Sequence, residues 1–297
     1  MAADFVFLTD THHYPDAPED FGAPKMLTRS REVLDAIVPA VNELGPDFIV
    51  HGGDLLCGGG SFDLPRETYL RSVDEVSAAF SGFRSPSYYI PGNHDCDAQD
   101  GSFEALARKI KIPVVLDVVE AAPRLRLALA NIYHRGNPIE DGNGTWTDDL
   151  DAALRGAADE ALADRCAIIL IIHTWLITDY EIGRGTINNA DRLLNTISSH
   201  PAVVAVFTGH RHLNRIQAIR DFLVVDTACL IGFPLGFRRV RLNEDGMFTT
   251  TFCQLDLPEV LQDSYARSSP EANNRWQGEL HDRDTEILIP RLKDIWS

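Results

Sequence analysis

Short apolar runs of this 297-residue sequence end repeatedly in side chains that can bind metal ions. In "YYIPGNHD", an aromatic and branched run stops at a proline and a glycine and then presents Asn93, His94 and Asp95. A plain turn can carry such residues, because Asn and Asp bond their own backbone. Other runs end in the same way, however, and the full set of metal-capable residues at their ends is Asp10, His12, Asp54, Asn93, His94, His173, His210 and His212.

We expect these side chains to lie together at one edge of a sheet, because ligands of open α/β sheets bind at the carboxyl ends of the strands. Imidazole combined with carboxylate and amide oxygen suits Mn, Fe or Zn, whereas all-oxygen sites suit Mg or Ca. The set is too large for one ion, and Asp54 is the natural bridge because a carboxylate has two oxygens. Two ions about 3.5 to 4 Å apart serve in-line phosphoryl displacement, with a hydroxide held between them as the nucleophile.

The elements that must position these residues alternate between strand and helix, which is typical of a layered α/β fold. In the last third, strands follow one another with short turns, which predicts a mostly antiparallel second sheet. Together these patterns predict an α/β (α+β) fold, a four-layer α-β-β-α sandwich of two mixed sheets flanked by helices. Predicted helices cover 30–44, 67–80, 148–163 and 189–199, and predicted strands cover 4–10, 47–54, 87–95, 125–134, 166–173, 202–210, 222–228 and 236–242.

The chain length fits one large domain, as α/β folds of this size often form. We assign residues 1–257 to the catalytic domain and residues 258–297 to a C-terminal surface extension packed on the same domain. The extension is polar and aperiodic, so we expect weak local order there.

The ordered motifs resemble those of the calcineurin-like metallophosphoesterases, which are D-x-H, G-D, G-N-H-[DE], H and G-H-x-H. They occur here as "DTH", "GGD", "GNHD", "IIHT" and "GHRH". The resemblance implies two divalent or trivalent transition-metal ions, with His94 off the metals, stabilising the transition state or protonating the leaving oxygen, and Asp95 orienting its ring. It implies that one ion is held by Asp10, His12, Asp54 and His212, and the second by Asp54, Asn93, His173 and His210.

The resemblance has one departure, because Trp175 stands where many relatives have proline after the fourth motif. A looser resemblance, carried by "TWTDDLDAAL" (145–154), is to bacterial cyclic-nucleotide and glycerophosphodiester phosphodiesterases. The resemblance therefore favours a phosphodiesterase acting on small diesters. A phosphomonoesterase or protein phosphatase is the alternative, and it needs arginines to grip a dianion. A catalytically silent binding scaffold is disfavoured by the complete ligand set. The arginines that could bind the dianion of a monoester are Arg135, Arg184, Arg211 and Arg215.

Composition and charge restrict the partners. A formal net charge of -17 repels long nucleic acid. No apolar run is long enough to span a membrane and no signal peptide is evident, so we expect a cytoplasmic protein. The five cysteines lack C-x-x-C pairing and are expected to be core or wall residues. A small phosphate ester is the expected partner, and a homo-oligomer is left open.

Two irregular segments follow ligand motifs directly, residues 13–24 and 175–187. Both are longer than ordinary connections. We therefore expect them to form the mouth through which the substrate enters.

Overall fold

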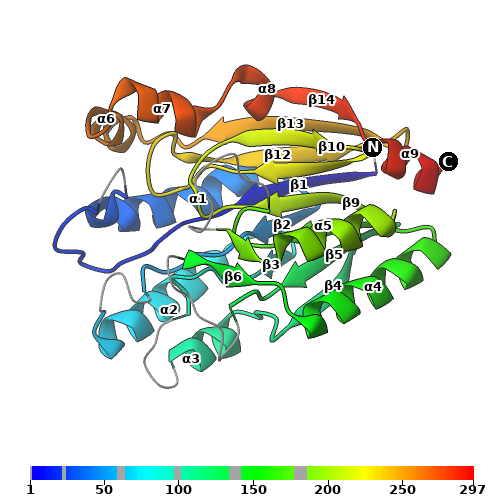
Figure 1. Ribbon diagram of the computed structural model, residues 1–297. Helices are drawn as coiled ribbons and strands as arrows, with labels where there is room; N and C mark the ends of the chain where they lie inside the picture. The colour runs from blue at the N-terminus through cyan, green and yellow to red at the C-terminus, as the bar shows by residue number, and fades with distance from the viewer. Residues whose placement is uncertain (1, 22–24, 59–63, 97–101, 134–141, 177–185) are drawn as a thin grey trace.

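The computed structural model describes residues 2–21, 25–58, 64–96, 102–133, 142–176 and 186–297. Two six-stranded sheets face each other, each mixing parallel and antiparallel strands (Figure 1). In order across the first sheet, the strands are β14 (Thr285–Leu288), β13 (Met247–Gln254), β12 (Gly236–Leu242), β1 (Ala3–Leu8), β2 (Phe48–His51) and β3 (Ser87–Tyr89). Across the second they are β10 (Arg215–Ile219), β11 (Phe222–Asp226), β9 (Val203–Thr208), β7 (Ala167–Ile171), β5 (Leu125–Ala130) and β4 (Leu116–Ala122).

Helices cover the outer faces of both sheets, as the sequence predicted (Figure 1). A small parallel pair, β6 (Gly144–Thr145) and β8 (Ile187–Asn188), lies apart from the two sheets. The helices are η1 (Leu27–Arg29), α1 (Ser30–Leu44), α2 (Arg66–Phe80), α3 (Ser102–Lys109), α4 (Asp148–Ala163), α5 (Ala190–Ser199), α6 (Pro258–Ala266), α7 (Pro270–Gln277), α8 (Leu280–Arg283) and α9 (Pro290–Trp296). The bounds of α1 and α4 are those expected from the sequence.

The alternation of side chains along β1 explains the layers, since successive residues of a strand point to opposite faces. Val6 and Leu8 pack in a core shared with α1 and α2. Phe5 and Phe7 point the other way, into the core between the sheets, where the ring of Phe7 lies 5.1 Å from that of Phe207 on β9. A third core joins the outer face of the second sheet to α4 and α5. Three apolar layers thus hold four structural layers together, and the predicted sandwich is confirmed.

The sequence analysis expected the strands of the last third to form a second sheet of their own, but the structure divides them between the two sheets. Strand β11 pairs in parallel with β9 and antiparallel with β10, and so extends the second sheet. Strand β12 instead pairs antiparallel with β1 and carries β13 at the edge of the first sheet. A short turn in the sequence predicts that the two strands it connects pair antiparallel, but it does not predict which sheet those strands join.

The expectation of weak local order after residue 257 is wrong. Four helices and a strand occupy this region, and β14 pairs with β13. Leu292 and Trp296 of α9 are buried in the core between the sheets. The fully buried guanidinium of Arg238 also donates to the backbone oxygens of Asp282 and Arg283. The helices are too short to show a clear period, and long-range packing orders them. The division at residue 257 stays a prediction.

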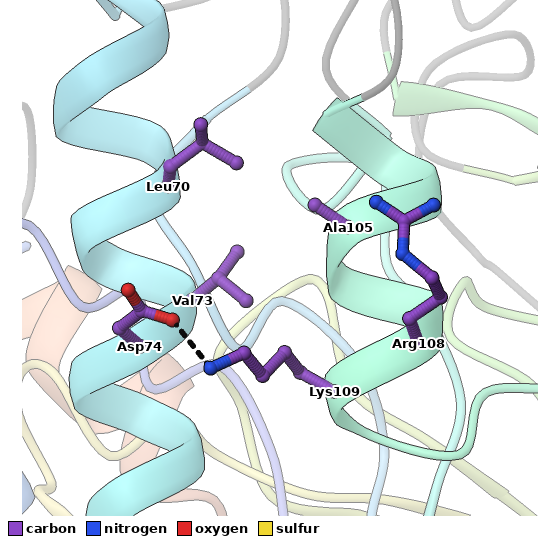
Figure 2. A pocket seen from close by; sticks show the side chains of 6 residues that line it. All are labelled: Leu70, Val73, Asp74, Ala105, Arg108 and Lys109. Atoms are coloured by element: carbon purple, nitrogen blue, oxygen red, sulfur yellow. Dashed lines mark ion pairs between the residues drawn. The ribbon is translucent and has the colours of Figure 1, made fainter.

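Helices α2 and α3 lie side by side and line a cavity of about 300 Å³ (Figure 2). Lys109 of α3 forms a 2.8 Å ion pair there with Asp74 of α2. None of the motif residues lines this cavity. Over the part of the chain that the structure describes, no helix has both the length and the apolar character needed to cross a membrane.

The packing of the tail predicts that Leu292→Ala lowers the free energy of unfolding by about 2–5 kcal/mol, because it leaves a cavity in a closed core. Leu280→Ala is the matched control, since Leu280 lies in the same tail but is 65% exposed; its effect should stay within about 0.5 kcal/mol. Urea denaturation of both variants measures the difference. Equal effects would show that the tail is not part of the core.

Candidate metal centre

The sequence-predicted ligands lie where parallel strands of both sheets end. Strands β1, β2 and β3 run parallel in the first sheet, and β7 and β9 do so in the second. Backbone contacts join the two edges: the His210 N–H donates to Asp10 Oδ2 at 3.0 Å, and His173 Nδ1 lies 2.7 Å from Gly52 O. The carboxyl ends of the strands therefore meet across the gap between the sheets.

Two groups of three ligand atoms form within this cluster. Asp10, His12 and His212 make the first group, and Asp54, His173 and His210 make the second; within each group the ligand atoms lie within 4.8 Å of one another. All these residues are buried except His210, which is partly exposed. Oxygen and imidazole nitrogen at such spacing can surround a transition-metal ion.

Asp54 connects the two groups. Its Oδ2 lies 3.1 Å from His173 Nε2 in one group and 3.5 Å from His12 Nε2 in the other. Its Oδ1 accepts a 2.8 Å hydrogen bond from the backbone N–H of His94. Asn93 Oδ1 approaches His210 Nδ1 at 2.9 Å and so joins the second group. The structure thus brings together all seven residues that the resemblance implied as ligands.

The backbone at most of these positions is strained in the same way. Five of the seven have positive φ angles, a region where non-glycine residues are uncommon but Asp and His are enriched. Such conformations cost roughly 1–3 kcal/mol each and cluster at functional sites. They turn the side chains back from the strand ends into the centre. The angles are 56° at Asp10, 43° at His12, 53° at Asp54, 71° at His210 and 57° at His212.

The orientation of His173 tests whether a metal ion fits. Its Nδ1 faces Gly52 O, which can only accept, so Nδ1 carries the hydrogen. Burial lowers the pKa of His173, but the charges of Asp54 and Asp10 outweigh burial and raise it to about 9, so without a metal ion Nε2 carries a proton toward Asp54 Oδ2 at 3.1 Å. A metal ion can take the place of that proton, because the deprotonated nitrogen and the carboxylate oxygen then both present lone pairs to it. The donor set therefore fits a metal ion.

Both ring nitrogens of His94 have partners other than the expected Asp95. Nδ1 lies 2.8 Å from Gly58 O and must donate to it. Nε2 lies 3.1 Å from Nζ of Lys25, so it accepts from the ammonium group. The expectation that Asp95 orients the His94 ring is therefore wrong. Lys25 was missed by the sequence analysis, because "APKM" carries no motif and follows no strand end.

Asp95 holds two ligand-bearing turns together instead. Its carboxylate accepts from the backbone N–H groups of Leu55 and Leu56 at 3.2 and 2.9 Å, just after Asp54. It also accepts from Gly92 N at 2.8 Å, just before Asn93. Burial and the charge of Asp54 raise the pKa of Asp95 to about 7, while these three donors oppose that rise. Asp95 thus acts by positioning the turns.

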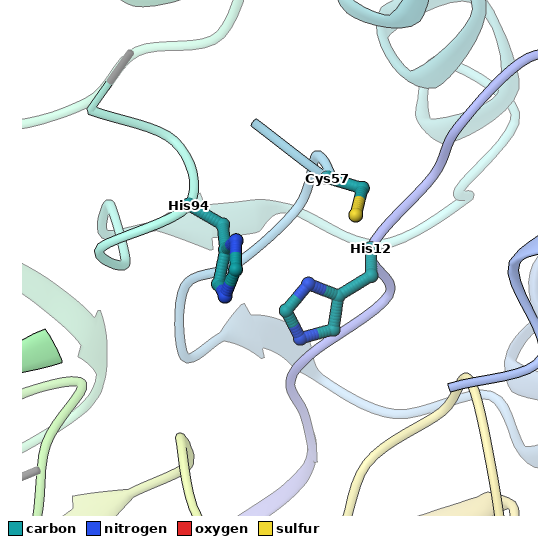
Figure 3. Close-up of side chains that lie close together, drawn as sticks. All are labelled: His12, Cys57 and His94. Carbon is teal, nitrogen blue, oxygen red and sulfur yellow. The ribbon is translucent and has the colours of Figure 1, made fainter. Parts of the chain in front are cut away.

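Cys57 lies beside His12 and His94, and one ligand atom from each of the three falls within 4.8 Å of the others (Figure 3). Burial raises the pKa of the Cys57 thiol to about 12, so the thiolate that binds metals is disfavoured. Its side chain packs in the core with α1 and α2. We therefore assign Cys57 to the wall of the centre, as the sequence analysis expected.

Trp175 connects two arginines at the second sheet. The guanidinium carbon of Arg215 lies 4.5 Å from the centroid of the Trp175 ring, and that of Arg211 lies 5.3 Å away. Arg215 Nε also donates to the buried Asp226 at 2.7 Å. Arg211 stands between the two histidines of "GHRH", so Trp175 steadies the loop that carries them. Arg135 and Arg184 lie outside the described residues.

The predicted substrate mouth is described only in part, because residues 22–24 and 177–185 lie outside the described residues. Within the first segment, His13 is buried and its Nε2 lies 2.8 Å from Glu75 on α2. This contact fastens the segment to a helix. The mouth as a whole stays a prediction.

The segment behind the looser resemblance begins a helix. Thr147 caps α4 by accepting from Leu150 N, and Trp146 Nε1 donates to Asp151 Oδ1 at 3.1 Å. Asp151 in turn accepts from Thr196 on α5 at 2.6 Å. These contacts account for the Trp-Thr-acidic pattern without a substrate, so the segment carries no argument about substrate class.

Comparisons with known proteins agree with this site. A family model described as calcineurin-like phosphoesterase matches residues 3–214. A search of curated proteins finds no match. Among solved structures, a dimetal phosphatase from Danio rerio is 13% identical with a TM-score of 0.72, covering 97% of this chain and 99% of that one.

Two further structures share the fold. A protein titled as a 5'-nucleotidase of Staphylococcus aureus is 14% identical with a TM-score of 0.53, covering 91% of this chain and 56% of that one. GAP50, titled as an anchor in the inner membrane complex of Plasmodium, is 14% identical with a TM-score of 0.53, covering 87% and 86%. At these identities, the likeness shows the fold alone.

The close approach at Gly92 predicts that Gly92→Ala weakens metal binding without removing a ligand. An added Cβ would lie 2.1 Å from Asp54 Oδ1, so the carboxylate must move. Displacing the support of a ligand costs roughly 10- to 100-fold in metal affinity. Gly156→Ala is the control, because open space surrounds Gly156 on α4. Metal titration followed by calorimetry measures both, and unchanged affinity in Gly92→Ala would contradict this placement of Asp54.

Proposed function

The chain belongs to the calcineurin-like phosphoesterase family, and on this premise we propose that it hydrolyses small phosphodiesters at a pair of transition-metal ions. The observation that carries the proposal is the position of Asp54 between two groups of ligand atoms. Mn, Fe or Zn suits these oxygen and imidazole donors. When bound, two such ions supply Lewis acidity and activate a water molecule as the nucleophile.

The residues of the chain divide the remaining work. Asp10 and Asp54 hold negative charge in fixed positions, because both are buried and both have left-handed backbone angles that pre-organise the site. His94 stands beside the first group, its ring centroid 4.8 Å from that of His12. His94 Nε2 accepts from the Lys25 ammonium group, so the proton that this pair can give to the departing oxygen is carried by Lys25 and held in place by His94. Asp95 holds the turn that carries Asp54 against the turn that carries Asn93.

A phosphodiester is favoured over a monoester because of the arginines. A monoester dianion needs arginine grips, but Arg215 is bound by the buried Asp226 and lies against Trp175. A phosphomonoesterase is the second candidate. A binding scaffold is the third, since a protein titled as an anchor has a similar fold; the complete ligand set argues against it. All five cysteines are free, which supports a reducing compartment such as the cytoplasm.

We expect the purified protein, loaded with Mn, Zn or Fe, to hydrolyse bis(p-nitrophenyl) phosphate with a higher kcat/KM than p-nitrophenyl phosphate. The physical reason is that Arg215 is already bound by Asp226, so it does not supply an arginine grip for the second negative charge of a monoester. A difference of about tenfold corresponds to 1.4 kcal/mol of transition-state binding. Preference for the monoester would move the assignment to the second candidate, and hydrolysis of neither, with metals bound, would favour the scaffold.

His94→Ala should slow esters with poor leaving groups far more than esters with good ones. A proton donor contributes roughly 10²- to 10⁴-fold only where the departing oxygen needs a proton, and a nitrophenolate does not. Comparing kcat/KM for an alkyl and a nitrophenyl diester measures the effect. Equal losses would mean that His94 only stabilises charge on the phosphoryl oxygens. Loss of metal would make His94 a ligand.

A further inference from the structure

Lys25 is placed at the metal centre although no motif points to it. Its Nζ lies 3.1 Å from His94 Nε2. We propose that Lys25 is a substrate-binding residue, whose ammonium group donates hydrogen bonds to the phosphoryl oxygens of the ester at the metal centre. This inference rests on the proposed function and adds a binding group that neither the ligand motifs nor the resemblance includes.

The backbone of Lys25 is fixed from both sides. Lys25 and Phe21 exchange two backbone hydrogen bonds, each of 3.1 Å. The next residue, Met26, is buried and its N–H donates to Ile231 O at 2.9 Å. A long, flexible lysine loses less entropy on binding when its backbone is already held in place. The side chain therefore starts from a fixed point beside His94.

The C-terminal tail fastens the same segment. Asp20, just before Phe21, pairs with Arg267 at the end of α6 at 2.9 Å, and its Oδ1 accepts from the Thr28 N–H at 2.8 Å. Arg29 approaches Asp263 of α6 at 3.6 Å. These contacts give the ordered tail a role in the active site, because they hold the segment that carries Lys25.

One hydrogen bond joins the ammonium group of Lys25 to His94. His94 Nδ1 donates to Gly58 O, so Nε2 can accept one N–H from Lys25. An ammonium group has three N–H donors and no acceptor. Lys25 can therefore bond to His94 and to a phosphoryl oxygen at the same time. His94 acts as an anchor that aims the ammonium group at the centre.

The charge of Lys25 lies near the ligand residues. Its ammonium group bonds to His94 Nε2 at 3.1 Å, and the ring centroid of His94 lies 4.8 Å from that of the ligand His12. A cation so close to the first ligand group is unfavourable for binding metals, since like charges repel. It becomes favourable once an anionic phosphoryl group bonds to it, because hydrogen bonds between charged partners are about twice as strong as neutral ones.

The test measures binding of inorganic phosphate to the metal-loaded protein by calorimetry, with no turnover required. Lys25→Met, which keeps the length but removes the charge, should weaken phosphate binding roughly 10- to 100-fold, with two metals still bound. Lys25→Arg should restore most of the affinity. Lys109→Met is the matched control, because Lys109 lies in the surface ion pair with Asp74 (Figure 2), and it should bind phosphate as the wild type does.

A role limited to positioning His94 gives a different pattern. In that case Lys25→Met would lower kcat alone, and adding it to His94→Ala would not weaken phosphate binding further. The proposal predicts a rise in KM and a further loss of about tenfold in the double variant. It is overturned if Lys25→Met binds phosphate as tightly as the wild type, or if the metal-loaded wild type binds none. If phosphate binding depends on Lys25 but no ester is hydrolysed, the proposed function fails and the binding role stands.

Discussion

The carboxylate of Asp54 is the contact on which the rest of the centre depends. One of its oxygens lies near histidines of both ligand groups, and the other accepts the backbone N–H of His94. Burial raises the pKa of Asp54, but His173, His94 and His12 outweigh burial and hold the pKa well below its usual value. The neighbouring Gly92 has no side chain where the carboxylate must sit. The Asp54 carboxylate thus sets the distance between the two ligand groups and the position of the His94 backbone.

The fold serves this constraint by bringing two sets of strand ends together. Phe5 and Phe7 of β1 fill the core between the sheets, and the ring of Phe7 meets Phe207 from the other sheet. The same two strands, β1 and β9, continue into the loops that carry Asp10 and His210. Apolar packing therefore fixes the distance between the sheets, and the left-handed backbone angles turn the ligands into the space that remains.

The sequence predicted most of this centre because each ligand follows the end of a strand by only a few residues. The bounds of α1 and α4 were predictable from apolar periodicity and, at α4, from the cap at Thr147. Lys25 was not predictable, because its position depends on a backbone bridge to Phe21 and on a contact between Met26 and the distant Ile231. The partner of Asp95 was assigned wrongly for a similar reason: adjacency in sequence to His94 says little about which way a buried side chain points.

The central claim is that one carboxylate, Asp54, joins two metal ions. It is tested most directly by adding Mn²⁺ to the metal-free protein and recording electron paramagnetic resonance at increasing metal-to-protein ratio. The account predicts that two ions bind per chain and that their spectrum is that of a magnetically coupled pair, with coupling lost in Asp54→Ala. A single ion per chain, or two ions with the spectrum of isolated Mn²⁺, would contradict it.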